Sequence, residues 1–240
     1  MNLNQVALVT GGSQGIGLAT VIALAKNGYQ VVAMSRSEEH FVSAKKIVPN
    51  ELINNIDFIR GDVCDETEVK SIFKATIEKH KRLDVLINCA GVSMDSKRSF
   101  ADTTTKHWNK IIDTNLTGTY LMCREALPHL IKSESGYILN IQSTASYKSQ
   151  AGTSLYAASK FGVRALTDSL IDEYRNSKLR ITSVSPGPVA TTIWDHKLSP
   201  PSEQEKSKML RPEDIADIFI WLLSRPAYLH IPDITVTPWN

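Results

Sequence analysis

Val6-Ala7-Leu8-Val9 leads directly into Thr10-Gly11-Gly12-Ser13-Gln14-Gly15-Ile16-Gly17, and a helical pattern follows. A short apolar strand, a glycine turn and a helix in this order give a glycine motif its meaning. Gly11 permits a tight turn, Gly15 lets the backbone approach a phosphate, and Gly17 lets the helix pack on the strand. The first amides of the helix and its dipole favour an anion. The stretch predicts a phosphate-binding turn. A plain strand-to-helix turn is the alternative, because Gly-x-Gly-x-x-Gly is the commoner spacing.

The same alternation of short apolar runs and longer amphipathic segments continues along the chain. The expected strands are 6–9, 31–34, 56–59, 83–87, 137–141, 180–184 and 234–236. The expected helices are 16–27, 38–48, 66–80, 104–132, 154–176 and 212–224. Continuous apolar strands separated by helices predict an α/β fold: a single domain over residues 1–240 with a doubly wound parallel sheet (a Rossmann fold) and helices on both faces.

The alternation breaks between about 187 and 211, where prolines cluster with charged residues. Helical periodicity resumes at 212–224, which disfavours a linker to a second domain. We interpret 188–211 as a substrate-covering lid. Together with 93–100 and 145–153, this segment is expected to touch the substrate, and Met94, Tyr147 and Trp194 are candidates for apolar contacts.

Composition narrows the class of protein. A hydrophobic content of 42% and a charged content of 22% are ordinary for a globular domain, and a net charge of +2 argues against nucleic-acid or anionic-membrane partners. No apolar run approaches the ~18–20 residues of a membrane span, and no export signal is visible. The cysteines are Cys64, Cys89 and Cys123, and they do not show the spacing of a metal site. The same holds for His107, His129 and His196. We therefore expect free thiols, no metal and a cytoplasmic location.

The end of the second expected strand bears on the choice of cofactor. NAD sites usually place an acid there to bind the ribose 2′-hydroxyl. Here Met34-Ser35-Arg36-Ser37 has no acid until Glu38, and Arg36 offers a bidentate fork to a 2′-phosphate. A solvated loop arginine is the alternative, and Gln14 stands where a second cation would help. We expect NADP(H) in preference to NAD(H).

Three polar side chains follow the fifth expected strand at the edge where open α/β sheets bind ligands. Ser143 ends that strand, and Tyr156 and Lys160 lie one turn apart in the next helix. A phenol can protonate an alkoxide at neutral pH only if its pKa falls from about 10, and a nearby ammonium lowers a pKa by ~1–3. Ser143 could hydrogen-bond the substrate oxygen, although Thr144 and Ser146 compete for that role. Beside a dinucleotide turn, this set predicts hydride transfer.

These motifs, in this order, resemble the short-chain dehydrogenase/reductase family over about residues 5–190. Asn115 is similar to the family asparagine that holds a water in a proton relay. The resemblance implies that Tyr156 is the general acid/base and that Ser143 orients the carbonyl. It also implies that Lys160 lowers the pKa of the tyrosine and holds the nicotinamide ribose.

The resemblance also assigns cofactor contacts beyond the glycine turn. Asp62-Val63 resembles the pair that contacts adenine, Asn88-Cys89-Ala90-Gly91 matches the family Asn-Asn-Ala-Gly with one change, and Pro186-Gly187 begins the stretch that grips the carboxamide. The implied cofactor-binding residues are Gly11, Ser13, Gln14, Gly15, Ile16, Gly17, Ser35, Arg36, Asp62, Val63, Asn88, Ala90, Gly91, Tyr156, Lys160, Pro186, Gly187, Val189 and Thr191.

The carboxyl-terminal part departs from many members of the family. The usual glycine-rich close is missing, and the ending, with Trp194, resembles sepiapterin-reductase-like small carbonyl reductases. The expected function is NADP(H)-dependent, reversible reduction of a small ketone or aldehyde. Alternatives are a 3-ketoacyl carrier or CoA reductase, although acids are interleaved with Lys197, Lys206 and Lys208, and a catalytically inactive dinucleotide sensor. We expect a homodimer or homotetramer that pairs through 104–132 and 154–176.

Overall fold

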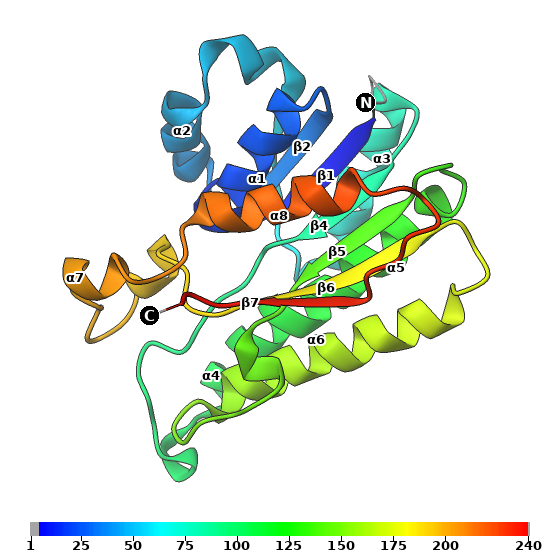
Figure 1. Cartoon of the computed structure of the whole chain (residues 1–240). Helices are drawn as coiled ribbons and strands as arrows, with labels where there is room; N and C mark the ends of the chain where they lie inside the picture. Colours follow the sequence, from blue (N-terminus) through cyan, green and yellow to red (C-terminus); the bar gives the residue numbers. More distant parts are fainter. Residues whose placement is uncertain (1–4, 240) are drawn as a thin grey trace.

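The computed structural model describes residues 5–239 and contains a seven-stranded sheet with helices packed on its two faces (Figure 1). The strands are β1 (Val6–Thr10), β2 (Gln30–Ser35), β3 (Ile56–Arg60), β4 (Val85–Asn88), β5 (Tyr137–Ile141), β6 (Arg180–Pro186) and β7 (Asp233–Val236). Their order in the sheet is β3-β2-β1-β4-β5-β6-β7, and every neighbouring pair is parallel. The prediction of a single doubly wound α/β domain is confirmed.

The helices connect successive strands. The α-helices are α1 (Gly15–Lys26), α2 (Glu38–Ile47), α3 (Glu66–His80), α4 (Thr105–Ile112), α5 (Gly118–Leu130), α6 (Ser154–Glu173), α7 (Glu203–Lys206) and α8 (Pro212–Leu223). The short helices are η1 (Asn50–Asn55), η2 (Phe100–Asp102), η3 (Asp113–Thr117), η4 (Thr144–Ser146) and η5 (Thr192–Trp194). Short helices η5 and α7 interrupt the proline-rich stretch that was predicted to be a lid.

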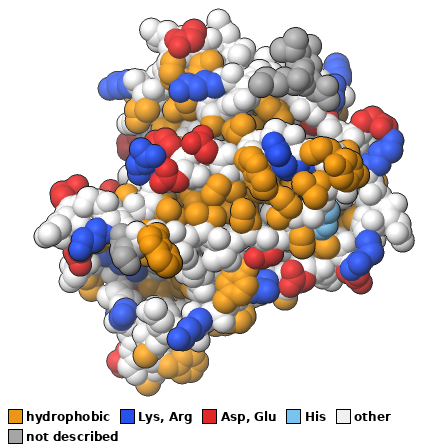
Figure 2. All heavy atoms as spheres, viewed as in Figure 1, with side chains coloured by type: hydrophobic (Ala, Val, Ile, Leu, Met, Phe, Trp, Pro, Cys, Tyr) orange, Lys and Arg blue, Asp and Glu red, His pale blue; other side chains and the backbone are white. Residues whose placement is uncertain are grey.

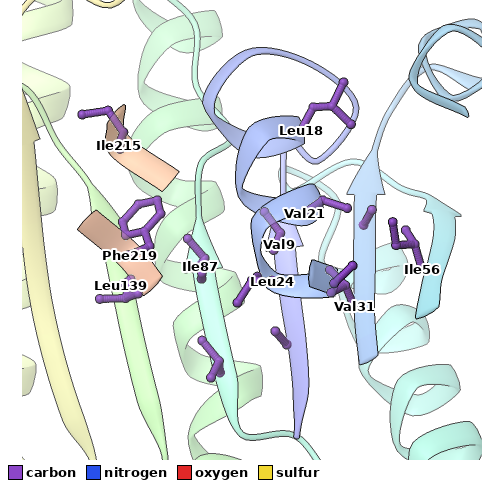
Figure 3. Close-up of a cluster of buried hydrophobic side chains, with 14 of the residues drawn as sticks. Val9, Leu18, Val21, Leu24, Val31, Ile56, Ile87, Leu139, Ile215 and Phe219 are labelled. Carbon is purple, nitrogen blue, oxygen red and sulfur yellow. The ribbon is translucent and has the colours of Figure 1, made fainter. Parts of the chain in front are cut away.

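The core lies in two layers because side chains of a strand alternate between the faces of the sheet. On β1, Ala7 and Val9 join the cluster beneath α1 and α8, whereas Val6 and Leu8 join the cluster beneath α3, α5 and α6. Figure 3 shows the first cluster, in which Phe219 of α8 lies over the sheet. Full burial of one such phenylalanine contributes about 1.5–3 kcal/mol to folding. Both faces are therefore covered.

The order of the strands creates the crevice in which a site is expected. The chain moves outward from β1 to β2 and β3 and then returns to β4 on the other side of β1. The connections after β1 and β4 consequently diverge at the carboxyl edge, and open α/β sheets bind ligands at this point. The glycine turn, the loop after β4 and the segment after β5 all begin at this edge.

The expected helix over 104–132 is continuous but contains a π-helical segment at η3. The amide of Gly118 donates to the carbonyl of Asp113, which is the i→i+5 bond of a wider turn. Gly118 also packs so closely on Val63 that a Cβ at this position would lie 2.6 Å from its Cγ2. The segment places Asn115 in the interior, where it is 1% exposed.

Candidate active site

Ser143, Tyr156 and Lys160 lie together at the carboxyl edge of the sheet, and their catalytic roles stay predictions. Ser143 is the N-cap of η4 directly after β5, and its Oγ accepts from the amide of Ala145 at 3.1 Å. Tyr156 and Lys160 lie on one face of α6, and the Lys160 Nζ is 5.8 Å from the centre of the tyrosine ring. The Ser143 side chain is hydrogen-bonded to Tyr156. A hydroxyl, a phenol and an ammonium therefore share one small site.

Burial controls the protonation of this site. Lys160 is 4% exposed and donates to the carbonyl of Ile141 at 3.1 Å. Burial lowers the pKa of Lys160 to about 8, and the nearby Cys89 opposes the shift. Burial also raises the pKa of Tyr156, while the hydrogen bond with Ser143 lowers it. Lowering of the Tyr156 pKa by Lys160 stays a prediction for the complex with a dinucleotide.

Asn115 joins the π-helical segment to the loop after β4. Its Oδ1 accepts from the amide of Val92 at 2.8 Å, and its Nδ2 donates to the Val92 carbonyl and to Ser159 Oγ, each at 3.0 Å. Its backbone carbonyl accepts from Thr119 Oγ1 at 2.7 Å. The side chain therefore holds Val92 and α6 together. Support of a water relay stays a prediction.

The glycine turn has the shape that a bound phosphate requires. Gly11 and Gly15 have φ values of 66° and 52°, which favour glycine. A Cβ at Gly17 would lie 2.1 Å from the carbonyl oxygen of Gly11, so only glycine permits this packing. A Cβ at Gly11 would lie 3.1 Å from Ala90, and one at Gly15 would lie 3.2 Å from Thr191. Two other predicted cofactor segments, represented by Ala90 and Thr191, therefore pack against this turn.

The amino end of α1 is open to an anion. Its N-cap, Gln14, makes no side-chain capping bond, and the first turn, which begins Gly15-Ile16, contains no acid. In contrast, α2 and α3 are capped by Ser37 and Asp65 and carry acids in their first turns. Helix N-termini of the first kind attract phosphates. The cradle of close glycines and the free first-turn amides fit a dinucleotide diphosphate.

Side chains at the ends of β1, β2 and β3 form the neighbouring part of the edge. Ser13 Oγ donates to Ser35 Oγ at 2.8 Å. The Arg36 guanidinium is 56% exposed and lies 3.7 Å from the Asp62 carboxylate, which also accepts from the amide of Cys64. Val63 is buried against α5. An exposed cation and two hydroxyls are therefore available to a phosphate at this position.

The side chain of Asn88 lies inside the sheet, and its part in cofactor binding stays a prediction. It is 3% exposed, and its Nδ2 donates to Asn140 Oδ1 at 2.9 Å and to Cys123 Sγ at 3.4 Å. Its Oδ1 has no hydrogen-bond partner among residues 5–239. Ala90 and Gly91 carry the backbone that faces the glycine turn and Lys160. Asn88 thus positions this backbone from below.

The stretch from Pro186 to Thr191 begins the predicted lid and is held at both ends. The amide of Gly187 donates to Val236 at 2.7 Å, and that of Leu210 donates to the carbonyl of Pro188 at 3.0 Å. Val189 is buried, and its carbonyl accepts from the indole of Trp194 at 2.7 Å. Thr191 Oγ1 accepts from Ile193 and begins η5. Closure over substrate stays a prediction.

A hollow of about 600 Å³ lies between α1 and this lid. Gly15, Leu18, Thr191, Asp195 and Lys206 are among its lining residues. It adjoins the phosphate end of the site, and none of the catalytic side chains lines it. The hollow therefore fits the cofactor side of the crevice better than the reaction centre.

Two residues that position the site were missed by sequence reasoning. Thr10 Oγ1 accepts from the amides of Cys89 and Ala90 at 3.1 and 3.0 Å, and this joins β1 to the loop after β4. Ser159, the partner of Asn115, is fully buried within α6. A hydroxyl at the end of an apolar strand was a usable signal for Thr10, but no pattern pointed to Ser159.

Two kinds of feature were searched for across the described part of the chain. Within residues 5–239, no helix is long and apolar enough to cross a membrane. No group of three or more histidine, cysteine or carboxylate side chains in this range could hold a metal ion.

Comparison with known proteins identifies the class. Residues 5–201 match the family of short chain dehydrogenases. An uncharacterized oxidoreductase of Staphylococcus saprophyticus is 32% identical over 235 residues, covering 98% of this chain and 97% of that protein. The closed form of a serine dehydrogenase complexed with NADP+ has a TM-score of 0.88 at 26% identity, covering 98% and 95% of the two chains. A metagenomic short-chain oxidoreductase in complex with NADP has a TM-score of 0.82 at 28% identity, covering 98% and 97%.

The chain therefore belongs to the short-chain dehydrogenase/reductase family and is an oxidoreductase. The family predicted from the motifs is confirmed. The sepiapterin-reductase-like subgroup stays a prediction.

Proposed function

We propose that the protein is an NADP(H)-dependent reductase of ketones or aldehydes that also works in reverse as an alcohol dehydrogenase. The observation that carries the proposal is the meeting of Ser143, Tyr156 and Lys160 beside the glycine turn. Similar solved structures contain NADP, which supports the same choice here.

The dinucleotide supplies or accepts the hydride when bound. The open amino end of α1 would hold its diphosphate, and Arg36, with Ser13 and Ser35, would hold a 2′-phosphate. Lys160 would bind the hydroxyls of the nicotinamide ribose. The segment from Pro186 to Thr191 would hold the carboxamide.

The chain's own residues handle the proton. The hydroxyl of Ser143 donates a hydrogen bond to the carbonyl oxygen and orients it. The phenol of Tyr156 gives its proton to this oxygen as negative charge develops on it. The phenolate that remains is stabilised by the ammonium of Lys160, which is mostly charged at pH 7 because its pKa is about 8.

Two enzymatic alternatives and one other class compete with this proposal. A 3-ketoacyl carrier reductase needs a cationic entrance, but Lys206 is paired with Glu203 and Asp195. A pteridine carbonyl reductase would differ in substrate alone. A dinucleotide sensor without turnover would bind NADPH and reduce nothing, and the complete set of catalytic side chains argues against it.

Turnover with a panel of aldehydes and ketones tests the proposal. We expect NADPH to be oxidised faster than NADH and bound more tightly. Arg36→Asp should weaken NADPH binding about tenfold and reduce the difference between the affinities for NADPH and NADH, because a carboxylate repels the phosphate and accepts from a ribose hydroxyl. Equal dissociation constants of the unmodified protein for NADPH and NADH would refute the cofactor choice. Tight NADPH binding without reduction of any carbonyl, or oxidation of any alcohol, would favour the sensor.

We also propose assembly into a homodimer or homotetramer. Large apolar side chains are exposed on α4, α5 and α6, namely Trp108, Tyr120, Ile131 and Phe161. Figure 2 shows a second apolar area over α8 and β7, and Trp221, Tyr228 and Leu229 are exposed on α8 and the connection to β7. Light scattering at micromolar concentration tests this, and a monomer mass would refute it. A cytoplasmic setting completes the proposal, since the thiols of the described chain are unpaired.

A further inference from the structure

The predicted lid contacts the loop after β4 near residues 93–95. The amide of Leu198 donates to the carbonyl of Asp95 at 2.9 Å, and the Lys197 Nζ donates to Ser93 Oγ at 3.2 Å. The same loop contacts the segment before α6, because the amide of Arg98 donates to Gly152 at 3.2 Å. The three segments predicted to contact substrate thus meet around residues 93–98.

This junction has more cations than carboxylates. The Nη2 of Arg98 donates to both carboxylate oxygens of Asp95, at 2.9 and 2.8 Å, so the charge of Asp95 is largely balanced. Lys97 adds a second cation on the loop, and Lys197 faces it from the lid. The Asp95 carboxylate also attracts the Lys197 ammonium and raises its pKa, which partly opposes the effect of burial, but one carboxylate faces three cations. A positive charge is therefore left over.

Lys197 is not an ordinary solvated lysine. Its ammonium lies 5.7 Å from the centre of the Trp194 ring, and the indole of Trp194 is fixed by its bond to Val189. Burial lowers the pKa of Lys197, so the charge sits in a partly dry environment. In such an environment an opposite charge is bound more strongly than in open water.

The junction also adjoins the reaction centre. Met94, the residue after Ser93, is 6% exposed and packs with Ile111, Leu155 and the ring of Tyr156. This apolar cluster separates the phenol from the charged junction. A substrate whose carbonyl lies at Tyr156 would therefore extend past Met94 toward Ser93, whose Oγ accepts from Lys197.

We propose that Lys197 binds an anionic group of the substrate, so that the enzyme selects carbonyl compounds that carry a carboxylate, such as short oxo acids. This assignment rests on the proposed function for the carbonyl end of the site. Lys197 is a specificity-determining residue that takes no part in proton transfer.

A binding experiment with an acid and its ester tests the assignment without turnover. Calorimetry measures acetoacetate and methyl acetoacetate against the protein saturated with NADP+, which cannot reduce a ketone. We expect the acid to bind more tightly than the ester. Lys197→Met should weaken binding of the acid at least about tenfold and leave the ester within about twofold, since a charge-assisted hydrogen bond is lost.

Two further variants separate charge from shape. Lys197→Arg keeps the cation and should preserve the preference for the acid. Lys208→Met is the matched control, because Lys208 is an exposed lysine of the lid and does not line the cofactor-side hollow. It should leave both affinities unchanged.

Each outcome is decisive. Failure of the acid to bind, equal affinity for acid and ester, or an equal loss of both in Lys197→Met would overturn the assignment. The proposed function fails in a different assay, namely when none of the carbonyl compounds tested causes oxidation of NADPH. Acid binding that depends on Lys197 in a protein without turnover would therefore sink the reductase and leave the anion site standing.

Discussion

The two halves of the sheet are built differently. Apart from Thr10 at the end of β1, the buried side chains of β1 and β2 are apolar, and Val31, Val32, Ala33 and Met34 are fully buried. The strands β4, β5 and β6 carry polar side chains in equally buried positions. These are Asn88, Asn140, Gln142, Thr182, Ser183 and Ser185.

The buried polar groups of the second half are bonded across strands. Asn140 accepts from Asn88 and donates to Thr167 Oγ1 of α6 at 3.0 Å, and Gln142 donates to Ser183 at 2.6 Å. The first half needs only to present the backbone of the glycine turn, for which close apolar packing is enough. The second half must hold catalytic side chains on α6 in place, and hydrogen bonds between strands and helix specify one arrangement.

The largest expected effect lies in the second half. Tyr156→Phe removes the proton donor, so the rate of carbonyl reduction should fall by ~100-fold or more, while NADPH binding stays nearly unchanged. Stopped-flow measurement of hydride transfer, with fluorescence titration of NADPH, checks both parts. Retention of more than about a tenth of the rate would show that the proton comes from another group.

The matching change in the first half acts on the backbone. Gly17→Ala places a Cβ 2.1 Å from the Gly11 oxygen, so the turn must move. We expect the free energy of unfolding to fall by at least about 1–3 kcal/mol and NADPH binding to weaken. Gly91→Ala is the control for stability, because its Cβ would meet nothing closer than 3.4 Å. If urea unfolding shows equal stability for the two variants, the close packing is not what requires glycine.

The buried polar network should behave as a unit. Asn140→Leu leaves the Asn88 amide with only the Cys123 sulfur as acceptor and should cost about 1–3 kcal/mol in urea unfolding. Adding Asn88→Leu removes the unpaired group, so the double variant should lose less than the sum of the single changes. Additive losses would contradict the claim that these side chains are coupled.

The smallest expected effect concerns Lys160, whose substitution should remove activity but raise stability. The pKa of Lys160 is about 8 in the folded protein and 10.5 ordinarily, so the unfolded chain binds more protons between these values. Stability therefore rises with pH from about 8 to 10.5, and the full cost of the buried ammonium is present below 8. Lys160→Met removes this cost, and we expect about 1–2 kcal/mol of added stability at pH 7 together with lost activity. Urea unfolding of both proteins at pH 7 and pH 10 checks this, and lower stability of the variant at pH 7 would reverse the interpretation.

The sequence predicted the first half of the sheet better than the second. The apolar runs and the glycine turn follow local patterns, so the strands and α1 could be predicted. The meeting of Ser143 with Tyr156 followed from the rule that parallel strands end at one edge. In contrast, the burial of Asn88 against Asn140 depends on strand register, which no local pattern specifies. The contact between Lys197 and Ser93 joins residues far apart in the chain, so local sequence patterns could not predict it either.

The π-helical segment at η3 determines how α5 is rotated about its axis. An α-helix advances about 100° per residue, so the residue that widens the turn at 113–117 rotates α5 about its axis relative to α4. Deleting one residue there would give a single regular helix with the same circular dichroism spectrum. Either the packed side of α5 or Asn115 would then point the wrong way. A variant with a regular helix would thus lose the hydrogen bonds between Asn115 and Val92. Its function would be lost although its circular dichroism spectrum would not change.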